Sequence, residues 1–109
     1  MKLEPPIRID SRKITHYLLV PLPRSDKSAY LNRAGYTVDN WRLLEQDLLQ
    51  LAASEEAIFE EEDRYGPSFS IIGELIGPVG RPIMVKTIWK RDIDEEITKF
   101  ITLLPQKRA

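Results

Sequence analysis

The sequence predicts an α+β domain in which two helices pack on a four-stranded antiparallel sheet (meander), after a short N-terminal arm. Apolar residues recur at helical spacing across residues 41–52. After residue 55 they alternate with polar residues at the period of a β-strand instead. Short loops separate these later segments, which favours pairing between strands that are neighbours in the chain.

Length and composition place limits on the kind of protein. A chain of 109 residues is the size of one domain, here divided into an arm (1–12), a globular core (13–105) and a tail (106–109). There is no cysteine, so a disulfide or a thiol site is excluded. The first residues lack the apolar stretch of a signal peptide, and no apolar run is long enough to span a membrane. We therefore expect a cytoplasmic protein.

The first elements of the chain are short. Ile7-Arg8-Ile9 in the arm is expected to be an edge strand at most. Residues 14–20 are apolar and are closed by Pro21 and Pro23, because proline cannot continue either a helix or a paired strand. A strand and a single helical turn both fit this segment, and the sequence leaves the two open.

Two helices are expected next. The first covers residues 27–33, with Ser25 or Asp26 as the N-cap and Gly35 at the C′ position. The second starts after a cap at Thr37 or Asp39 and ends near residues 53–54. The apolar stripe of the second helix consists of Trp41, Leu44, Leu48 and Leu51 or Ala52, widened by Leu43 and Leu49.

The strands are expected at residues 57–62, 69–75, 83–90 and 97–104. The last of these also fits a helix, but its Ile, Thr and Phe content favours a strand. Tyr65-Gly66-Pro67 is a turn signal, and residues 77–80 form a hairpin loop. In the third strand one face carries Ile83, Val85, Thr87 and Trp89, and the other carries Met84, Lys86, Ile88 and Lys90.

The charge is nearly balanced, with a formal net charge of −1 and a pI of about 5.9. Nucleic-acid binders are usually basic, because cations that neutralise phosphates supply much of their affinity. The distribution is uneven, however. Residues 51–66 hold six acidic side chains and one basic one, whereas residues 67–91 hold four basic side chains and one acidic one. This permits an RNA-facing surface without requiring one.

No motif identifies a reaction. With a single histidine, His16, neither a histidine-rich metal site nor a pair of histidines for acid–base work can exist, and no cofactor motif is present. His16 is either structural or a general base. Lys86 and Lys90, with Arg81 nearby, either grip a phosphate backbone or cover apolar neighbours with their stems. The acids of residues 60–63 are read as a solvated edge strand rather than as a cation site.

Several short motifs together resemble an uncharacterised bacterial family. They are Lys13 with Tyr17-Leu18-Leu19, Lys27 with Gly35-Tyr36, Trp41 with Leu44, Tyr65-Gly66, Gly77-Pro78 with Gly80-Arg81, and Val85-Lys86-Thr87-Ile88-Trp89. The resemblance covers about residues 12–105. Members of this family stand alone or lie at the C-termini of polymorphic-toxin and phage-associated proteins. The fold it implies is the toxin-nuclease fold shared by barnase, EndoU, colicin and RelE-type ribonucleases.

The resemblance implies a toxin-like, metal-independent endoribonuclease. Lys13, Lys27, Lys86 and Thr87 would contact the phosphate or the transition state, and His16 would act as a base. Lys90, Arg81 and Trp89 complete the expected substrate-binding set. Where the family tends to read Thr-Ala-Tyr-Pro, this chain has Thr102-Leu103-Leu104-Pro105, so a leucine replaces a tyrosine.

The alternative is a non-catalytic binding module. It would be the partner of a toxin–antitoxin or phage system, an antitoxin or another protein, and it would dock through its acidic edge strand. A homodimer through the same edge is a third option.

Overall fold

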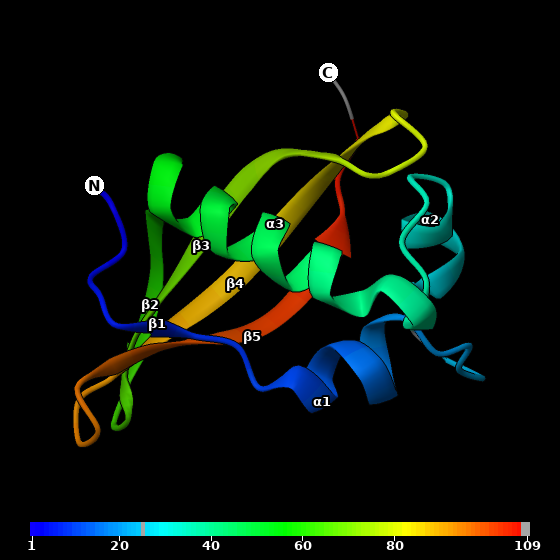
Figure 1. The fold of residues 1–109 in the computed structure, drawn as a ribbon. Helices are drawn as coiled ribbons and strands as arrows, with labels where there is room; N and C mark the ends of the chain where they lie inside the picture. The colour runs from blue at the N-terminus through cyan, green and yellow to red at the C-terminus, as the bar shows by residue number, and fades with distance from the viewer. Residues whose placement is uncertain (25, 108–109) are drawn as a thin grey trace.

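A computed structural model describes residues 1–24 and 26–107 as an α+β fold built around one five-stranded sheet. The strand order is β1-β5-β4-β3-β2, and α3 lies across one face of the sheet (Figure 1). The elements in chain order are β1 (Ile7–Arg8), α1 (Ser11–Lys13), η1 (Ile14–Leu18), α2 (Ser28–Asn32), η2 (Val38–Asn40), α3 (Trp41–Ser54), β2 (Ile58–Asp63), β3 (Gly66–Ile76), β4 (Pro82–Asp92) and β5 (Ile97–Pro105).

The predicted antiparallel meander is confirmed for β2 to β5, but the prediction of a four-stranded sheet was wrong. β1 adds a fifth strand, and it runs parallel to β5 with Ile7 opposite Thr98. The backbone N–H of Thr98 donates to the Pro6 carbonyl at 2.9 Å, and Leu3 is buried in the core. The arm is therefore part of the sheet. Parallel strands far apart in the chain share no turn, so no local signal announces their pairing.

The last segment is a strand, as its composition favoured. β5 pairs along β4, and the Trp89 and Phe100 rings pack edge to face with 5.3 Å between their centroids. The pairing shifts register once, because Ile88 lies opposite Thr102 while Trp89 lies opposite Phe100. Ile101 is consequently the extra residue of a β-bulge.

The predicted core faces of the strands are confirmed. The buried core residues of β3, β4 and α3 are Phe69, Ile71, Leu75, Ile83, Val85, Thr87, Trp89, Leu44, Leu48, Leu51 and Ala52. Helix α3 comes close to the sheet at Gly73, where a Cβ atom would lie 2.4 Å from Leu51 Cδ1. The predicted Thr37 cap is also confirmed, since Thr37 and Asn40 form a capping box in front of the helix.

Residues 14–20, which the sequence left open, contain a π-helical turn. The N–H of Leu19 donates to the Ile14 carbonyl at 3.1 Å, and Ile14 and Leu18 are fully buried. Apolar residues in this segment therefore face the core from a helical turn that continues α1. The chain then leaves the turn before Pro21.

The first predicted helix, α2, is shorter than expected and starts at Ser28. Asp26 still caps the first turn of the helix, because one of its carboxylate oxygens accepts a hydrogen bond of 3.0 Å from the backbone N–H of Ser28. The alternative cap, Ser25, lies outside the described residues. Gly35 has a φ of +95° and follows the C-cap residue Arg33 by two positions, one later than predicted. Among the described helices, none is long and apolar enough to cross a membrane.

Candidate functional site

Two local irregularities of the backbone meet at one place, the π-helical turn after α1 and the β-bulge in β5. Lys13, at the end of α1, donates from Nζ to the carbonyl of the bulge residue Ile101 at 3.0 Å. π-Helical turns and β-bulges cost regular hydrogen bonding and are over-represented at functional sites. This junction is therefore our candidate functional site.

A buried lysine and a tyrosine occupy the junction. Lys27 is only 7% exposed, and its Nζ donates to the hydroxyl of Tyr17 at 2.6 Å. Tyr17 belongs to the π-helical turn and lies one helical turn after Lys13. Among the described residues, neither Lys13 nor Lys27 forms a salt bridge with a carboxylate. Two cations and a phenol thus gather without an anion to balance them.

Thr102, the residue after the bulge, adds a hydroxyl to this cluster. Its Oγ1 is buried and is the one such side-chain atom in residues 1–24 and 26–107 that lacks a hydrogen-bond partner. The Tyr17 hydroxyl is its neighbour, but the geometry between the two falls short of a hydrogen bond. A buried polar atom without a partner costs about 1–3 kcal/mol, so the Thr102 hydroxyl would gain from a hydrogen bond with a group that enters the cluster.

The electrostatics of the cluster favour negative charge. The hydrogen bond from Lys27 holds the pKa of Tyr17 below its ordinary value, while burial opposes the shift. The Thr102 hydroxyl and the charges of Lys27 and Lys13 lower this pKa further, by smaller amounts. We call Lys13, Tyr17, Lys27 and Thr102 the junction cluster. Its hydrogen-bond donors are two lysine ammonium groups and two hydroxyls. Groups of this kind bind phosphate, because charged donors form strong hydrogen bonds with its oxygens.

The outer face of the sheet continues the cluster. Thr102 lies opposite Ile88, and Lys86 lies opposite Leu104. Lys86 is therefore the diagonal cross-strand neighbour of Thr102 on the face away from α3. Leu104, the position where the family resemblance expects tyrosine, is 40% exposed on that same face.

A cleft of about 390 Å³ opens beside Lys13 and Ile101. Arg8 and Lys99 line it, together with the carboxylate of Asp10. Asp10 pairs with Arg12 at 3.1 Å, and Lys99 pairs with acids of the β4–β5 connection. Arg8 and Lys13 line the cleft without forming a salt bridge among the described residues. The two cations would extend a phosphate-binding surface beyond the junction cluster.

Two of the predicted site residues lie in the core instead. Thr87 and Trp89 have no exposed surface. The Thr87 hydroxyl accepts from Trp89 Nε1 at 2.8 Å and donates to the Ile71 carbonyl at 3.2 Å. This bond explains why a hydroxyl stands between apolar residues on the core face. In this structure neither side chain can touch a substrate.

The other predicted residues lie apart from one another. Lys90 forms a salt bridge with Asp63 at 2.5 Å and lies four residues along β4 from Lys86. Arg81 lies exposed beside the β3–β4 hairpin loop. His16 is exposed next to Tyr17, and in the described part of the chain its ring bonds only to Thr15, through Nδ1 at 2.7 Å. Of the predicted set, the structure brings Lys13 and Lys27 together around Tyr17, and Lys86 lies on the outer face of the sheet as a diagonal neighbour of Thr102.

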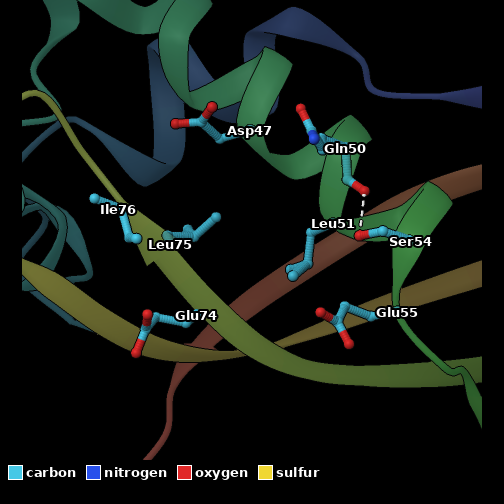
Figure 2. Close-up of a pocket in the computed structure, with 8 residues that line it drawn as sticks. All are labelled: Asp47, Gln50, Leu51, Ser54, Glu55, Glu74, Leu75 and Ile76. Atoms are coloured by element: carbon cyan, nitrogen blue, oxygen red, sulfur yellow. Dashed lines mark hydrogen bonds between the residues drawn. The ribbon is translucent and has the colours of Figure 1, made fainter.

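A second pocket lies between α3 and β3 and holds about 290 Å³ (Figure 2). Three carboxylates line it, from Asp47, Glu55 and Glu74, and they would repel a phosphate. Asp47 accepts a hydrogen bond of 2.5 Å from the Tyr36 hydroxyl. Burial, reinforced by this bond, raises the pKa of Tyr36. Within the described residues no group of acids or histidines is arranged to hold a metal ion.

Comparison with known proteins gives a family and a fold. A family model matches residues 4–107, nearly the whole chain. The chain belongs to the family described as Domain of unknown function (DUF6883). Among curated proteins, none is similar enough in sequence to count as a relative.

The fold is similar to a chain in a solved structure, described as a contact-dependent growth inhibition toxin–immunity protein complex from Klebsiella pneumoniae 342. The TM-score is 0.71 at 19% identity, over 90% of this DUF6883 chain and 98% of that chain. At this identity the similarity establishes a shared fold.

Sequence reasoning found the two lysines of the junction cluster but missed Tyr17 and Thr102 as site residues. The i, i+4 spacing of Lys13 and Tyr17 was the available signal, because it places both on one face of a helical turn. It carried weight only once residues 14–18 were known to be helical. Thr102 is the first residue of the segment compared with the family's Thr-Ala-Tyr-Pro, but that comparison gave it no role, and it lies next to a bulge in β5.

Proposed function

We propose that this protein is a toxin-like endoribonuclease that cleaves RNA without a metal ion at the junction cluster. The observation that supports this most is a buried lysine, Lys27, with a phenol and a second lysine beside it and no carboxylate partner. Burying an ammonium costs several kcal/mol unless an anion compensates it. A phosphodiester entering the cluster supplies that anion, and the two lysines stabilise the charge that builds up on phosphorus oxygens during cleavage.

The remaining predicted residues take subordinate places in this proposal. Lys86 contacts the backbone of the RNA on the outer face of the sheet. His16 is the proton acceptor for the attacking ribose 2′-hydroxyl, from its exposed place beside Tyr17. Thr87 and Trp89 support the sheet beneath, since both are buried.

The test is cleavage of total bacterial RNA by the purified protein in the presence of a chelator. The decisive variant is Lys27→Met, which removes the charge and keeps most of the stem of a side chain that is only 7% exposed. Lys27→Ala would leave a cavity as well and would confuse the result. Lys107→Met, at an exposed position outside the cluster, is the matched control.

Cleavage by wild type and by the control variant, with a loss of at least 100-fold in Lys27→Met, would support the proposal, since removing one preorganised donor costs about 10²–10³-fold. Intact RNA at high protein concentration would refute it. So would cleavage that the chelator abolishes.

A second candidate function, binding of a protein partner, is favoured by the exposed strand β2. It is the last strand of the sheet, and all six of its residues are exposed, including Ile58 at 57% and Phe59 at 55%. A partner strand can add to such an edge. In that case a complex would slow amide exchange along β2, and Phe59→Glu would weaken it, whereas Lys27→Met would leave it unchanged.

A further inference from the structure

The hydroxyl of Tyr17 lies next to the Lys27 ammonium, which can donate hydrogen bonds but cannot accept one. A lysine ammonium has three N–H donors and no acceptor. The hydrogen bond of 2.6 Å from Lys27 Nζ therefore ends on the phenolic oxygen, and the phenolic proton must point to another acceptor. The adjacent Thr102 hydroxyl lowers the pKa of Tyr17, as a donor to the phenolic oxygen does, and among the described residues no hydrogen bond runs from the phenol to an acceptor. The proton is thus available to a group that enters the cluster.

The phenolic proton of Tyr17 lies where the phosphodiester group of a bound RNA would be held. Lys13 and Lys27 both act electrostatically on the Tyr17 hydroxyl, and Thr102 is beside it. An anion held by the two lysines would have its oxygens within reach of the phenol. Lys27 would then also stabilise the phenolate that remains when the proton has gone, which favours giving up the proton over taking one.

The protonation state fits an acid better than a base. An ordinary tyrosine, with a pKa of about 10, carries its proton at neutral pH. The shift of the Tyr17 pKa is downward, which brings the phenol closer to the working pH and makes proton transfer to a leaving oxygen easier. His16, which is exposed on the same turn, would act as the general base.

We propose that Tyr17 is the general acid of the cleavage reaction, an inference that rests on the proposed ribonuclease function. The ribose 2′-oxygen attacks phosphorus and loses its proton to His16. The bond from phosphorus to the 5′-oxygen breaks, and that oxygen keeps the electron pair and takes the proton of Tyr17. The products are a 2′,3′-cyclic phosphate and a 5′-hydroxyl. Tyr17 recovers a proton from the imidazolium or from water, so the enzyme returns unchanged.

The experiment compares two substrates of the same sequence, an RNA dinucleotide and its analogue with sulfur in place of the bridging 5′-oxygen. A thiolate leaves without being protonated, so the analogue does not need the acid. Wild type, Tyr17→Phe and Tyr30→Phe are assayed on both. Tyr30→Phe is a matched control, because it also loses a hydroxyl, one that donates to the Met84 carbonyl outside the cluster.

We expect Tyr17→Phe to cleave the oxygen substrate about 10²–10⁴-fold more slowly than wild type, the usual range for a lost general acid. On the sulfur substrate it should come within about 10-fold of wild type. Because Tyr17→Phe also removes the acceptor of the buried Lys27 ammonium, its melting temperature should fall, and all rates are measured well below it. Tyr30→Phe should cleave both substrates normally.

Equal losses on both substrates would overturn the acid role and leave the proposed function standing. Full activity of Tyr17→Phe on the oxygen substrate would do the same. Failure of wild type to cleave either substrate would refute the ribonuclease itself, and with it the role of Tyr17. The two kinds of failure are therefore distinct.

Discussion

Replacement of Thr87 by valine tests whether this residue supports the core or takes part in the site. Valine has nearly the same shape, so it creates neither a cavity nor a clash. It removes the acceptor of the Trp89 indole N–H, a bond of 2.8 Å in a fully buried place. A buried donor left without a partner costs about 1–3 kcal/mol, and we expect a loss of about 2 kcal/mol. For a domain of this size that lowers Tm by roughly 10 °C.

The assay is thermal unfolding by circular dichroism, run in parallel with RNA cleavage well below the melting temperature. Thr87→Ser is the control, because it keeps the hydroxyl and loses one methyl group, worth about 1 kcal/mol. The valine variant should be the less stable of the two and should cleave RNA as fast as wild type at low temperature. A valine variant that melts with wild type but has lost cleavage would mean that Thr87 acts in the reaction and that our structural account of it is wrong.

Three further outcomes follow from the same contacts. Lys13→Met should slow RNA cleavage at least 10-fold, and should shift Tm little because the lysine stem is kept; equal rates in the cleavage assay would remove Lys13 from the site. Tyr36 is a buried phenol whose pKa is raised by burial and by Asp47, so the folded state holds this proton more tightly than the unfolded state. Its contribution to stability is complete below about pH 10 and falls as pH rises further; chemical denaturation across that range should show a smaller decline in Tyr36→Phe. In Gly77→Ala the new Cβ would lie 2.0 Å from the Ala34 carbonyl oxygen, so the β3–β4 hairpin must move and stability should fall by about 1–3 kcal/mol in urea titrations.

The parts of the fold that sequence predicts well are those set by local periodicity. Trp41 to Ser54 repeats its apolar residues at helical spacing, and β4 alternates so regularly that its core face could be named in advance. Both patterns arise because one face of an element is buried and the other is not. The residues between them need only short loops, so the meander follows.

The parts that sequence misses depend on contacts between distant segments. Ile7 pairs with Thr98, and no turn connects them. The π-helical turn at residues 14–18 holds β-branched residues that suit a strand equally well, and it is fixed by the burial of Ile14 and Leu18.

The site divides in the same way. Lys13 and Lys27 were expected to contact phosphate, on the strength of a family resemblance, and the structure places them together. Thr87 and Trp89 were predicted as site residues from the same resemblance. In the structure both are buried in the core, where the Trp89 indole N–H donates a hydrogen bond to the Thr87 hydroxyl. Thr102 was given no role in advance, because it meets Tyr17, a residue 85 positions earlier in the chain, only in the folded sheet.

The central claim is that the junction cluster binds the phosphate of RNA, and a titration tests it without requiring cleavage. The ligand is a short RNA with a 2′-deoxy residue at the cleavage position, and the readout is the amide chemical shifts of the labelled protein. We predict that the largest changes fall on Lys13, Tyr17, Lys27 and Thr102, and that Lys27→Met weakens binding at least 10-fold. Changes confined to β2 or to the acidic pocket of Figure 2, or no saturable change at all, would contradict the account.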